Sequence, residues 1–182
     1  MSHGIKHTRS QDLIDYAYDF AKAAHAGQVR KYTGEPYINH PVAVATLVAS
    51  VTDDCNMICA ALLHDTVEDC AVTIEEIATC GFGHPIAYLV DCLTDVSKLS
   101  DGNRATRKGI DRMHTANGSK DAKTIKLADL IDNSRSIVAH DPGFSVVYMT
   151  EKRLLLPFLI EGDAALYADA VRIINEYYEG IL

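Results

Sequence analysis

The segment AALLHDTVED, residues 60–69, places four side chains that bind metals or transfer protons directly beside an apolar run. They are His64, Asp65, Glu68 and Asp69. Charged side chains are seldom buried unless they are paired or bound to an ion. If the segment is one helix, residues four apart share a face, so His64 lies with Glu68 and Asp65 with Asp69. This pattern indicates a divalent-metal site in a helical core; the simpler alternative is a solvated acidic helix end.

Two further segments carry polar side chains that a metal site would explain. His40 directly precedes Pro41, a good helix-opening residue, and its simpler interpretation is a surface or capping histidine. Asp129 lies among leucine and isoleucine residues, where an unpaired carboxylate is costly. Its simpler interpretation is a partly exposed residue paired with Lys126.

Together these segments could supply two imidazoles and two carboxylates as metal ligands: His40, His64, Asp65 and Asp129. A ligand set without sulfur suits Mn²⁺, Fe²⁺ or Zn²⁺ in a catalytic site, whereas structural zinc sites usually contain cysteine. Such an ion keeps positions open for water and a phosphate oxygen, and Glu68 and Asp69 could orient or deprotonate that water. Spacing alone does not show that these segments meet in space.

The elements that must position these residues are all predicted to be helices, because nearly every segment has the helical period and none alternates like a strand. Apolar spacing, caps and breaks predict helices from after Ser10 to Gly27, over 41–51, from about 54 to 68, briefly between 73 and 81, and over 85–96, 104–116, 122–140, 144–160 and 163–179. Pro157 should kink or divide the helix over 144–160. The prediction is one compact all-α domain over residues 1–182, with a disordered tail at 1–9.

The composition excludes several classes of protein. Apolar residues make up 48% and charged residues 23% of the chain, and no apolar run approaches the ~20 residues that span a membrane. The net charge of -8 argues against DNA or RNA binding, yet allows a small phosphorylated ligand. Since the N-terminus lacks a signal-peptide core, we expect a cytoplasmic protein whose five cysteines are packing residues. The sequence is silent on oligomeric state.

Two groups of basic residues stand out against this acidic background. Arg30 and Lys31 are adjacent, and a second group lies in the middle of the chain: Arg104, Arg107, Lys108 and Arg112. The second group is equally compatible with a phosphate-binding surface and with the solvated face of a helix.

The order of these motifs resembles the HD-domain metal-dependent phosphohydrolases, in which a histidine, a His-Asp doublet and a later aspartate follow one another. More narrowly, the chain resembles the hydrolase domain of the RelA/SpoT family and the small alarmone hydrolases. The matching text is AHAGQVRKYTGEPYINHPVAVA (24–45), AALLHDTVED (60–69), VTIEEI (72–77) and IKLADLIDNSRS (125–136). The doublet alone is weak evidence, but the ordered combination is specific. The resemblance implies a compact HD-type helical bundle.

By position, the resemblance implies that His40, His64, Asp65 and Asp129 hold one metal ion, manganese in the family. It makes Glu68 and Asp69 the pair that polarises the attacking water. It places four residues at the nucleotide: Arg30, Lys31, Asn133 and Ser136. The implied reaction is hydrolysis of the 3′-pyrophosphate of guanosine tetra- or pentaphosphate, the alarmones of the stringent response, to GDP or GTP and pyrophosphate. The chain is too short for the family's synthetase and regulatory domains, so hydrolysis without synthesis is expected.

Two departures from the family pattern leave the substrate open. RKYTGEPY is one residue longer than the frequent RKSGEPY, and ADLIDN replaces ADRLHN, which puts Leu130 and Asp132 where the family has a basic and an aromatic residue. Loss of positive charge near the phosphates would favour another nucleotide, such as the 2′-phosphate of NADPH or an adenosine alarmone. A non-catalytic nucleotide sensor would be expected to have lost a ligand or an acid, and all six are present. A purely structural helical module would not explain carboxylates in apolar segments.

Overall fold

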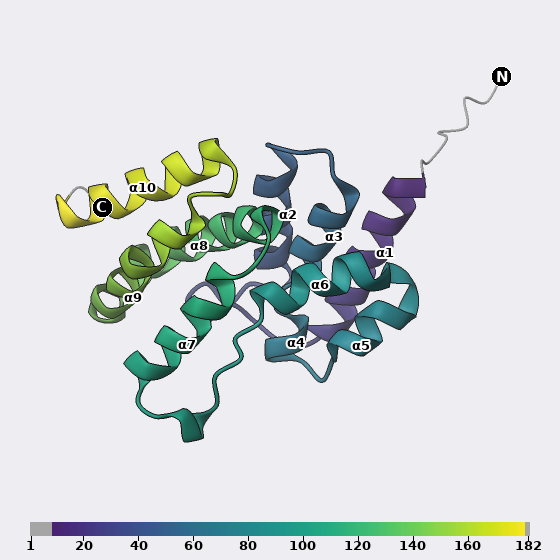
Figure 1. Ribbon diagram of the computed structural model, residues 1–182, viewed down its shortest axis with the longest axis horizontal. Coiled ribbons are helices and arrows are strands. Elements are labelled where there is room, and N and C mark those ends of the chain that lie inside the picture. Colours follow the sequence, from purple (N-terminus) through teal and green to yellow (C-terminus); the bar gives the residue numbers. More distant parts are fainter. Residues whose placement is uncertain (1–8, 181–182) are drawn as a thin grey trace.

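The computed structural model describes residues 9–180, which form helices joined by short loops and contain no β-strand (Figure 1). The all-α prediction is confirmed. The predicted tail over 1–9 lies outside the described residues except for Arg9, which begins the first helix. In chain order the helices are α1 (Arg9–Ala24), α2 (Asn39–Ala49), α3 (Cys55–Leu63), α4 (Thr66–Asp69), α5 (Ile74–Ile77), α6 (Gly83–Leu93), α7 (Arg104–Ala116), α8 (Lys120–His140), α9 (Pro142–Leu155) and α10 (Ala164–Tyr178).

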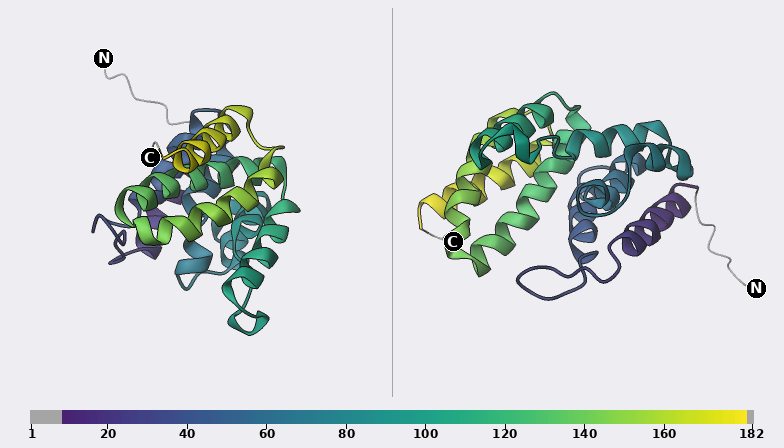
Figure 2. Two further views of the ribbon diagram at one scale, coloured as in Figure 1. Left: turned by 90° about the vertical axis from the view of Figure 1, so that its left-hand side faces the viewer. Right: turned by 90° about the horizontal axis from the view of Figure 1, so that it is seen from below.

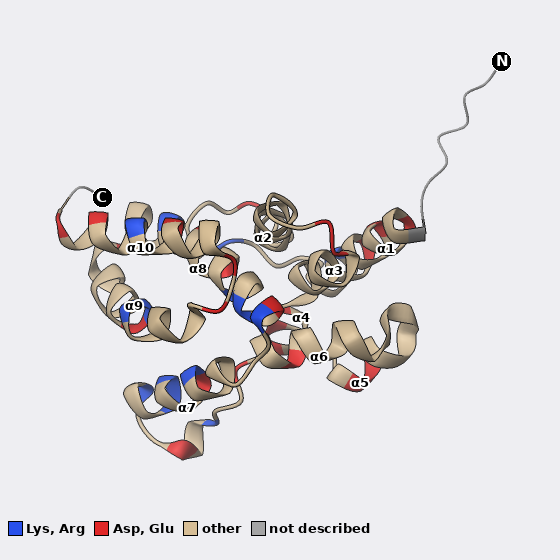
Figure 3. Cartoon of the chain, turned by 45° about the horizontal axis from the view of Figure 1, so that its top comes forward, with Lys and Arg blue, Asp and Glu red and all other residues tan. Residues whose placement is uncertain are grey.

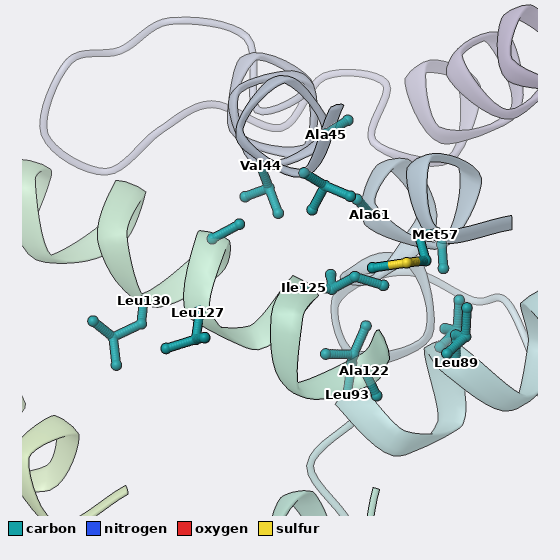
Figure 4. Close-up of a cluster of buried hydrophobic side chains, with 14 of the residues drawn as sticks. Val44, Ala45, Met57, Ala61, Leu89, Leu93, Ala122, Ile125, Leu127 and Leu130 are labelled. Atoms are coloured by element: carbon teal, nitrogen blue, oxygen red, sulfur yellow. The ribbon is translucent and has the colours of Figure 1, made fainter. Parts of the chain in front are cut away.

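Helix α8 lies at the centre of the molecule and packs against α2, α3, α6, α9 and α10 (Figures 1 and 2). Its N-terminal half is buried on every side, including Ile125, Leu127 and Leu130. Polar residues such as Lys123, Thr124 and Asp129 are buried along with the apolar ones, so α8 has no clear amphipathic stripe. Figure 4 shows Ala122 and Ile125 in one apolar cluster with side chains of α3 and α6.

Local capping explains where several helices begin. Ser119 accepts a hydrogen bond from the backbone N–H of Ala122 and caps α8, and Asn103 caps α7 in the same way. The predicted capping box is present, because Thr73 and Glu76 bond reciprocally at the start of α5. The predicted division at Pro157 is also present: α9 ends at Leu155 and a 3₁₀ turn follows over Leu156–Leu159.

The predicted helix over 54–68 is wrong in one respect that matters for the site. Helix α3 ends at Leu63, and α4 begins separately at Thr66. The side chain of His64 bonds the carbonyl oxygen of Ala61 through Nδ1 at 2.8 Å, and the Thr66 hydroxyl donates to the carbonyl oxygen of Leu63 at 2.7 Å. Side chains therefore satisfy carbonyls that a continuing helix would have bonded. His64, Asp65, Glu68 and Asp69 consequently do not share one helix.

Helix α7 lies at the periphery of the molecule. It carries the basic residues of the second group identified in the sequence (Figure 3). Only Asp111 and Thr115 of this helix are buried. The Asp111 carboxylate accepts backbone N–H groups of Val96 and Ser97 at 3.1 and 2.8 Å, which ties α7 to the loop after α6.

Candidate functional site

Three helices that pack against one another bring the four predicted ligands together. His40 lies in the first turn of α2, His64 and Asp65 at the junction of α3 and α4, and Asp129 in the middle of α8. The Nε2 atom of His40 lies 3.4 Å from Oδ2 of Asp65 and 3.4 Å from Oδ1 of Asp129. The Nε2 atom of His64 lies 3.1 Å from Oδ1 of Asp65 and 3.9 Å from Oδ1 of Asp129. Candidate ligand atoms of His40, His64 and Asp65 all fall within 4.8 Å of one another.

The two histidines are oriented as metal ligands should be. Nδ1 of His40 donates to the Asp132 carboxylate at 2.6 Å, and Nδ1 of His64 donates to the Ala61 carbonyl at 2.8 Å, since neither acceptor carries a proton to give. In a neutral ring this leaves each Nε2 lone pair facing the carboxylates, the arrangement found behind ligating histidines. Nε2 of His64 is buried and has no hydrogen-bond partner. The residues therefore fit a divalent cation.

The electrostatics of the cluster favour charged carboxylates. Burial opposes ionisation of Asp65, but the imidazoles of His64 and His40 outweigh it and lower the pKa of Asp65. Burial likewise opposes ionisation of Asp129, yet Lys126, whose Nζ lies 3.1 Å from Oδ2 of Asp129, and His40 hold the pKa of Asp129 well below its usual range. The expected Asp129–Lys126 pair is thus present, but Asp129 is buried, not partly exposed.

Glu68 and Asp69 lie beside the cluster in different surroundings. Burial, opposed by Lys126 and reinforced by Asp95, raises the pKa of Glu68 to about 7. Its Oε1 accepts the backbone N–H of Asp95 at 2.6 Å. Burial and the charge of Asp65 also raise the pKa of Asp69. A carboxyl group with a pKa of about 7, such as that of Glu68, can take up or release a proton at neutral pH, whereas an ordinary exposed glutamate stays ionised there.

Residues before α2 support Asp65 and Asp69. The Tyr37 hydroxyl donates to Oδ2 of Asp65 at 2.7 Å, and Nε2 of Gln28 donates to the carbonyl oxygen of Asp69 at 2.9 Å. His25 links these two residues, because its Nδ1 lies 2.8 Å from Oε1 of Gln28 and its ring lies 4.7 Å from the Tyr37 ring, centroid to centroid. None of these three residues was identified from the sequence as part of the site, although all lie in the AHAGQ…GEPY text.

A cleft of about 220 Å³ opens beside the predicted ligands Asp65 and Asp129 and is also lined by Glu68 and Asp69. Helices α7, α8 and α9 also contribute basic residues to its lining: Lys108, Arg112, Lys126 and Lys152. Acidic residues lie among them, because Asp95, Asp111 and Glu151 line the same cleft and Lys108 pairs with Asp95. Two members of the basic stretch, Lys108 and Arg112, therefore line the cleft, so that their helix is not wholly a solvated face. Lys152 and Leu155 come from α9, where the sequence carries no recognisable motif.

Comparison with known proteins agrees with this geometry. The model of the HD domain matches residues 17–143, which include the His-Asp doublet and Asp129. The chain belongs to the HD-domain family. Solved structures share the fold of this HD domain: a metazoan ortholog of SpoT, described as hydrolysing ppGpp and acting in starvation responses, has a TM-score of 0.82 at 27% identity and covers 98% of this chain and 100% of its own. A protein of Listeria monocytogenes EGD-e has a TM-score of 0.66 at 24% identity over 82% of this chain and 99% of its own, and shows the fold alone.

Curated relatives of this HD domain are much longer proteins. The guanosine-3′,5′-bis(diphosphate) 3′-pyrophosphohydrolase of Vibrio cholerae is 42% identical over 135 residues, 72% of this chain and 19% of the relative. A probable GTP pyrophosphokinase of Mycobacterium leprae is 38% identical over 127 residues, 69% of this chain and 16% of the relative. The chain thus spans less than a fifth of the length of these relatives. Among the described residues, no helix has both the length and the apolar character needed to cross a membrane.

The predicted nucleotide-binding residues of the HD domain occupy different places. Asn133 lines the cleft and donates to Oδ1 of Asp129 at 2.6 Å. Arg30 pairs with Asp132 at 3.0 Å on the far side of His40. Lys31 is exposed and lies 3.3 Å from Asp141, and neither it nor Ser136 lines the cleft.

Proposed function

We propose that this HD-domain protein hydrolyses the 3′-pyrophosphate of guanosine tetra- and pentaphosphate to GDP or GTP and pyrophosphate. One observation carries the proposal: two histidines and two aspartates cluster at a cleft that is also lined by Glu68, Asp69 and several basic residues, and the pKa of Glu68 is raised to about 7. The similarity to the metazoan SpoT ortholog that hydrolyses ppGpp and to the Vibrio pyrophosphohydrolase supports the choice of substrate.

His40, His64, Asp65 and Asp129 would hold the metal ion in this proposal. Manganese suits the mixture of imidazole and carboxylate ligands, and iron(II) or zinc also accept it. The ion, when bound, supplies a Lewis acid that lowers the pKa of water and offsets charge on a phosphate oxygen. Tyr37 keeps the Asp65 carboxylate in place, and Lys126 does the same for Asp129.

Glu68 would take the proton of the attacking water, and Asp69 would orient that water. The new bond joins the water oxygen to the phosphorus next to the ribose, the bond from that phosphorus to O3′ breaks, and O3′ acquires a proton. A pKa of about 7 lets Glu68 accept a proton at neutral pH and return it within the same cycle. Its backbone bond from Asp95 fixes the direction of the carboxylate.

Lys108, Arg112 and Lys152 would bind the phosphate groups. They line the same cleft as Asp65 and Asp129, so an anionic substrate in the cleft would reach from the metal ligands to these basic groups. Ammonium and guanidinium groups bond phosphate oxygens through charge-assisted hydrogen bonds. Asn133 would contact the nucleotide beside Asp129, as the resemblance implies.

A second candidate keeps the same site and changes the nucleotide, to the 2′-phosphate of NADPH or an adenosine alarmone. Arg30 favours it, because its pairing with Asp132 engages the guanidinium that the family pattern assigns to guanine.

The experiment that separates these candidates is product analysis after the manganese-loaded protein is incubated with ppGpp, pppGpp and NADPH. Release of pyrophosphate from ppGpp, lost on chelation and in Asp65→Ala, is the expected result. Intact ppGpp with phosphate released from NADPH would replace the first candidate by the second. Tight ppGpp binding without turnover at saturating Mn²⁺ would instead indicate a nucleotide sensor.

A further inference from the structure

Asp132 joins a metal ligand to the loop that follows α1. One carboxylate oxygen, Oδ2, lies 2.6 Å from Nδ1 of His40 and 3.0 Å from Nη2 of Arg30. The three side chains are largely shielded, with 23% of Asp132, 1% of His40 and 15% of Arg30 exposed. The departure from the family pattern at this position therefore does more than remove an aromatic side chain. It places a carboxylate directly behind His40.

The two histidines of the cluster consequently have different supports. Nδ1–H of His64 donates a hydrogen bond to a neutral backbone carbonyl, whereas Nδ1–H of His40 donates one to a carboxylate. A carboxylate behind a ligating imidazole fixes its orientation and increases its electron donation to the metal. A charge-assisted bond of this kind is also about twice as strong as a neutral one.

Arg30 holds the Asp132 carboxylate in place through an ion pair. Its loop is held by a backbone bridge between Val29 and Pro36 and by the hydrogen bond from the Arg30 N–H to the Glu35 carbonyl oxygen at 2.8 Å. The guanidinium therefore reaches Asp132 from a braced loop, and it supplies the positive charge that a partly buried carboxylate requires. Arg30 thus acts on the metal ligand through Asp132.

We propose that Asp132 is a positioning residue that sets the orientation and metal affinity of His40, and that Arg30 holds Asp132 in that role. This inference rests on the metal site of the proposed function. It does not depend on which nucleotide is hydrolysed.

The test measures Mn²⁺ binding to the protein without nucleotide, by titration calorimetry and by electron paramagnetic resonance of free Mn²⁺. Asp132→Ala should weaken Mn²⁺ binding by about 10- to 100-fold, the usual loss when the partner of a ligating histidine is removed. Asp132→Asn keeps an acceptor oxygen and should lose about threefold to tenfold. Arg30→Gln should weaken binding by about threefold in the wild type and have little effect once Asp132 is alanine, because the two residues act in series.

Asp141→Asn is the matched control. Asp141 binds Lys31 and Tyr32 of the same loop, at 3.3 and 2.8 Å, instead of a residue of the metal cluster. Asparagine also preserves its role as the cap of α9. Mn²⁺ affinity within twofold of the wild type is expected for this variant.

A spectroscopic reading separates positioning from general damage to the fold. The Nδ1 proton of His40 should give a strongly deshielded resonance that is lost in Asp132→Ala and retained in Asp141→Asn. Wild-type Mn²⁺ affinity in Asp132→Ala would overturn the proposal; if that variant does not fold, wild-type affinity in Asp132→Asn would do so. Failure of ppGpp hydrolysis with the predicted loss of Mn²⁺ affinity would overturn only the substrate.

Discussion

Glu68 and Asp69 are neighbours in the chain with different partners in space. Glu68 is fixed by the Asp95 N–H and lies near Lys126, whereas Asp69 is held through its carbonyl oxygen by Gln28. Glu68 combines a carboxylate fixed by a backbone N–H with a pKa of about 7. We therefore assign proton transfer to Glu68 and water orientation to Asp69.

Glu68→Gln should lower kcat by about 10²- to 10⁴-fold, the usual contribution of a general base, because the amide cannot accept a proton. Mn²⁺ affinity should stay within about threefold of the wild type, since Glu68 is not among the proposed ligands. Steady-state kinetics and calorimetry check both values. A near-normal kcat in Glu68→Gln together with a large loss in Asp69→Asn would reverse the assignment.

Lys152 should make substrate binding depend on pH. Burial and the positive charge of Lys126 lower the pKa of Lys152 to about 8, so its charge is complete well below pH 8 and lost above it. The positive charge that would bind a phosphate group is therefore lost as pH rises through about 8. In the wild type, KM for ppGpp should rise by about tenfold between pH 7 and 9, a loss comparable to one charge-assisted hydrogen bond.

Two variants of Lys152 check this pH dependence. Lys152→Arg should flatten the rise in KM, because guanidinium stays charged over this range. Lys152→Gln should show the high KM already at pH 7. An identical pH profile in all three proteins would exclude Lys152 from phosphate binding.

At the scale of elements, the break between α3 and α4 places Glu68 and Asp69 on a separate short helix. The apolar pattern of AALLHDTVED continues past His64, so a single helix is the natural prediction. The break arises because the side chains of His64 and Thr66 take over carbonyls at the end of α3. Boundaries set by local caps were easier to predict: the basic helix was expected over 104–116 and is found there, and the Thr73 capping box is present.

The contact between α8 and the turn before α10 gives a stability prediction. A Cβ on Gly162 would lie 3.0 Å from the backbone nitrogen of Thr124 and 3.1 Å from the carbonyl carbon of Lys123, and backbone atoms of a core helix do not move easily. Gly162→Ala should therefore reduce the free energy of unfolding by about 1–3 kcal/mol, the usual cost of overpacking. Urea denaturation measures it.

Gly109→Ala in α7 provides the opposite control. Its Cβ would meet only the flexible end of Arg112, at 3.9 Å, in a helix of ordinary backbone geometry. Alanine should raise the free energy of unfolding by about 0.4–1 kcal/mol, because it restricts the unfolded chain. Equal effects of the two variants would contradict the packing argument.

For the whole molecule, the proposed metal site joins α2, α3 and α8, helices that also contribute to the core. Two carboxylates converge there, with pKa values that histidines and Lys126 hold low. An ion that binds only the folded protein adds stability by mass action, about 2.7 kcal/mol at a concentration 100 times Kd.

Saturating Mn²⁺ should raise Tm by about 5–10 °C, given the usual shift of about 2–4 °C per kcal/mol for a chain of this size. Excess chelator should reverse the shift. Asp65→Asn should abolish it. The metal-free variant should itself melt below the wild type, because a carboxylate whose pKa is lowered in the folded protein stabilises that protein at neutral pH. Scanning calorimetry checks these three values, and a metal-induced shift that persists in Asp65→Asn would place the ion elsewhere.

The sequence by itself determined the helical architecture and the residue types of the metal cluster, because period, caps and the His-Asp doublet are local or ordered features of the chain. The tertiary structure decided which distant side chains meet. It brought Lys152 of α9 to the cleft, moved Lys31 and Ser136 away from its lining, and placed Asp132 behind His40. These relations depend on how α2, α8 and α9 pack, and packing angles and loop directions leave no periodic trace in the order of amino acids.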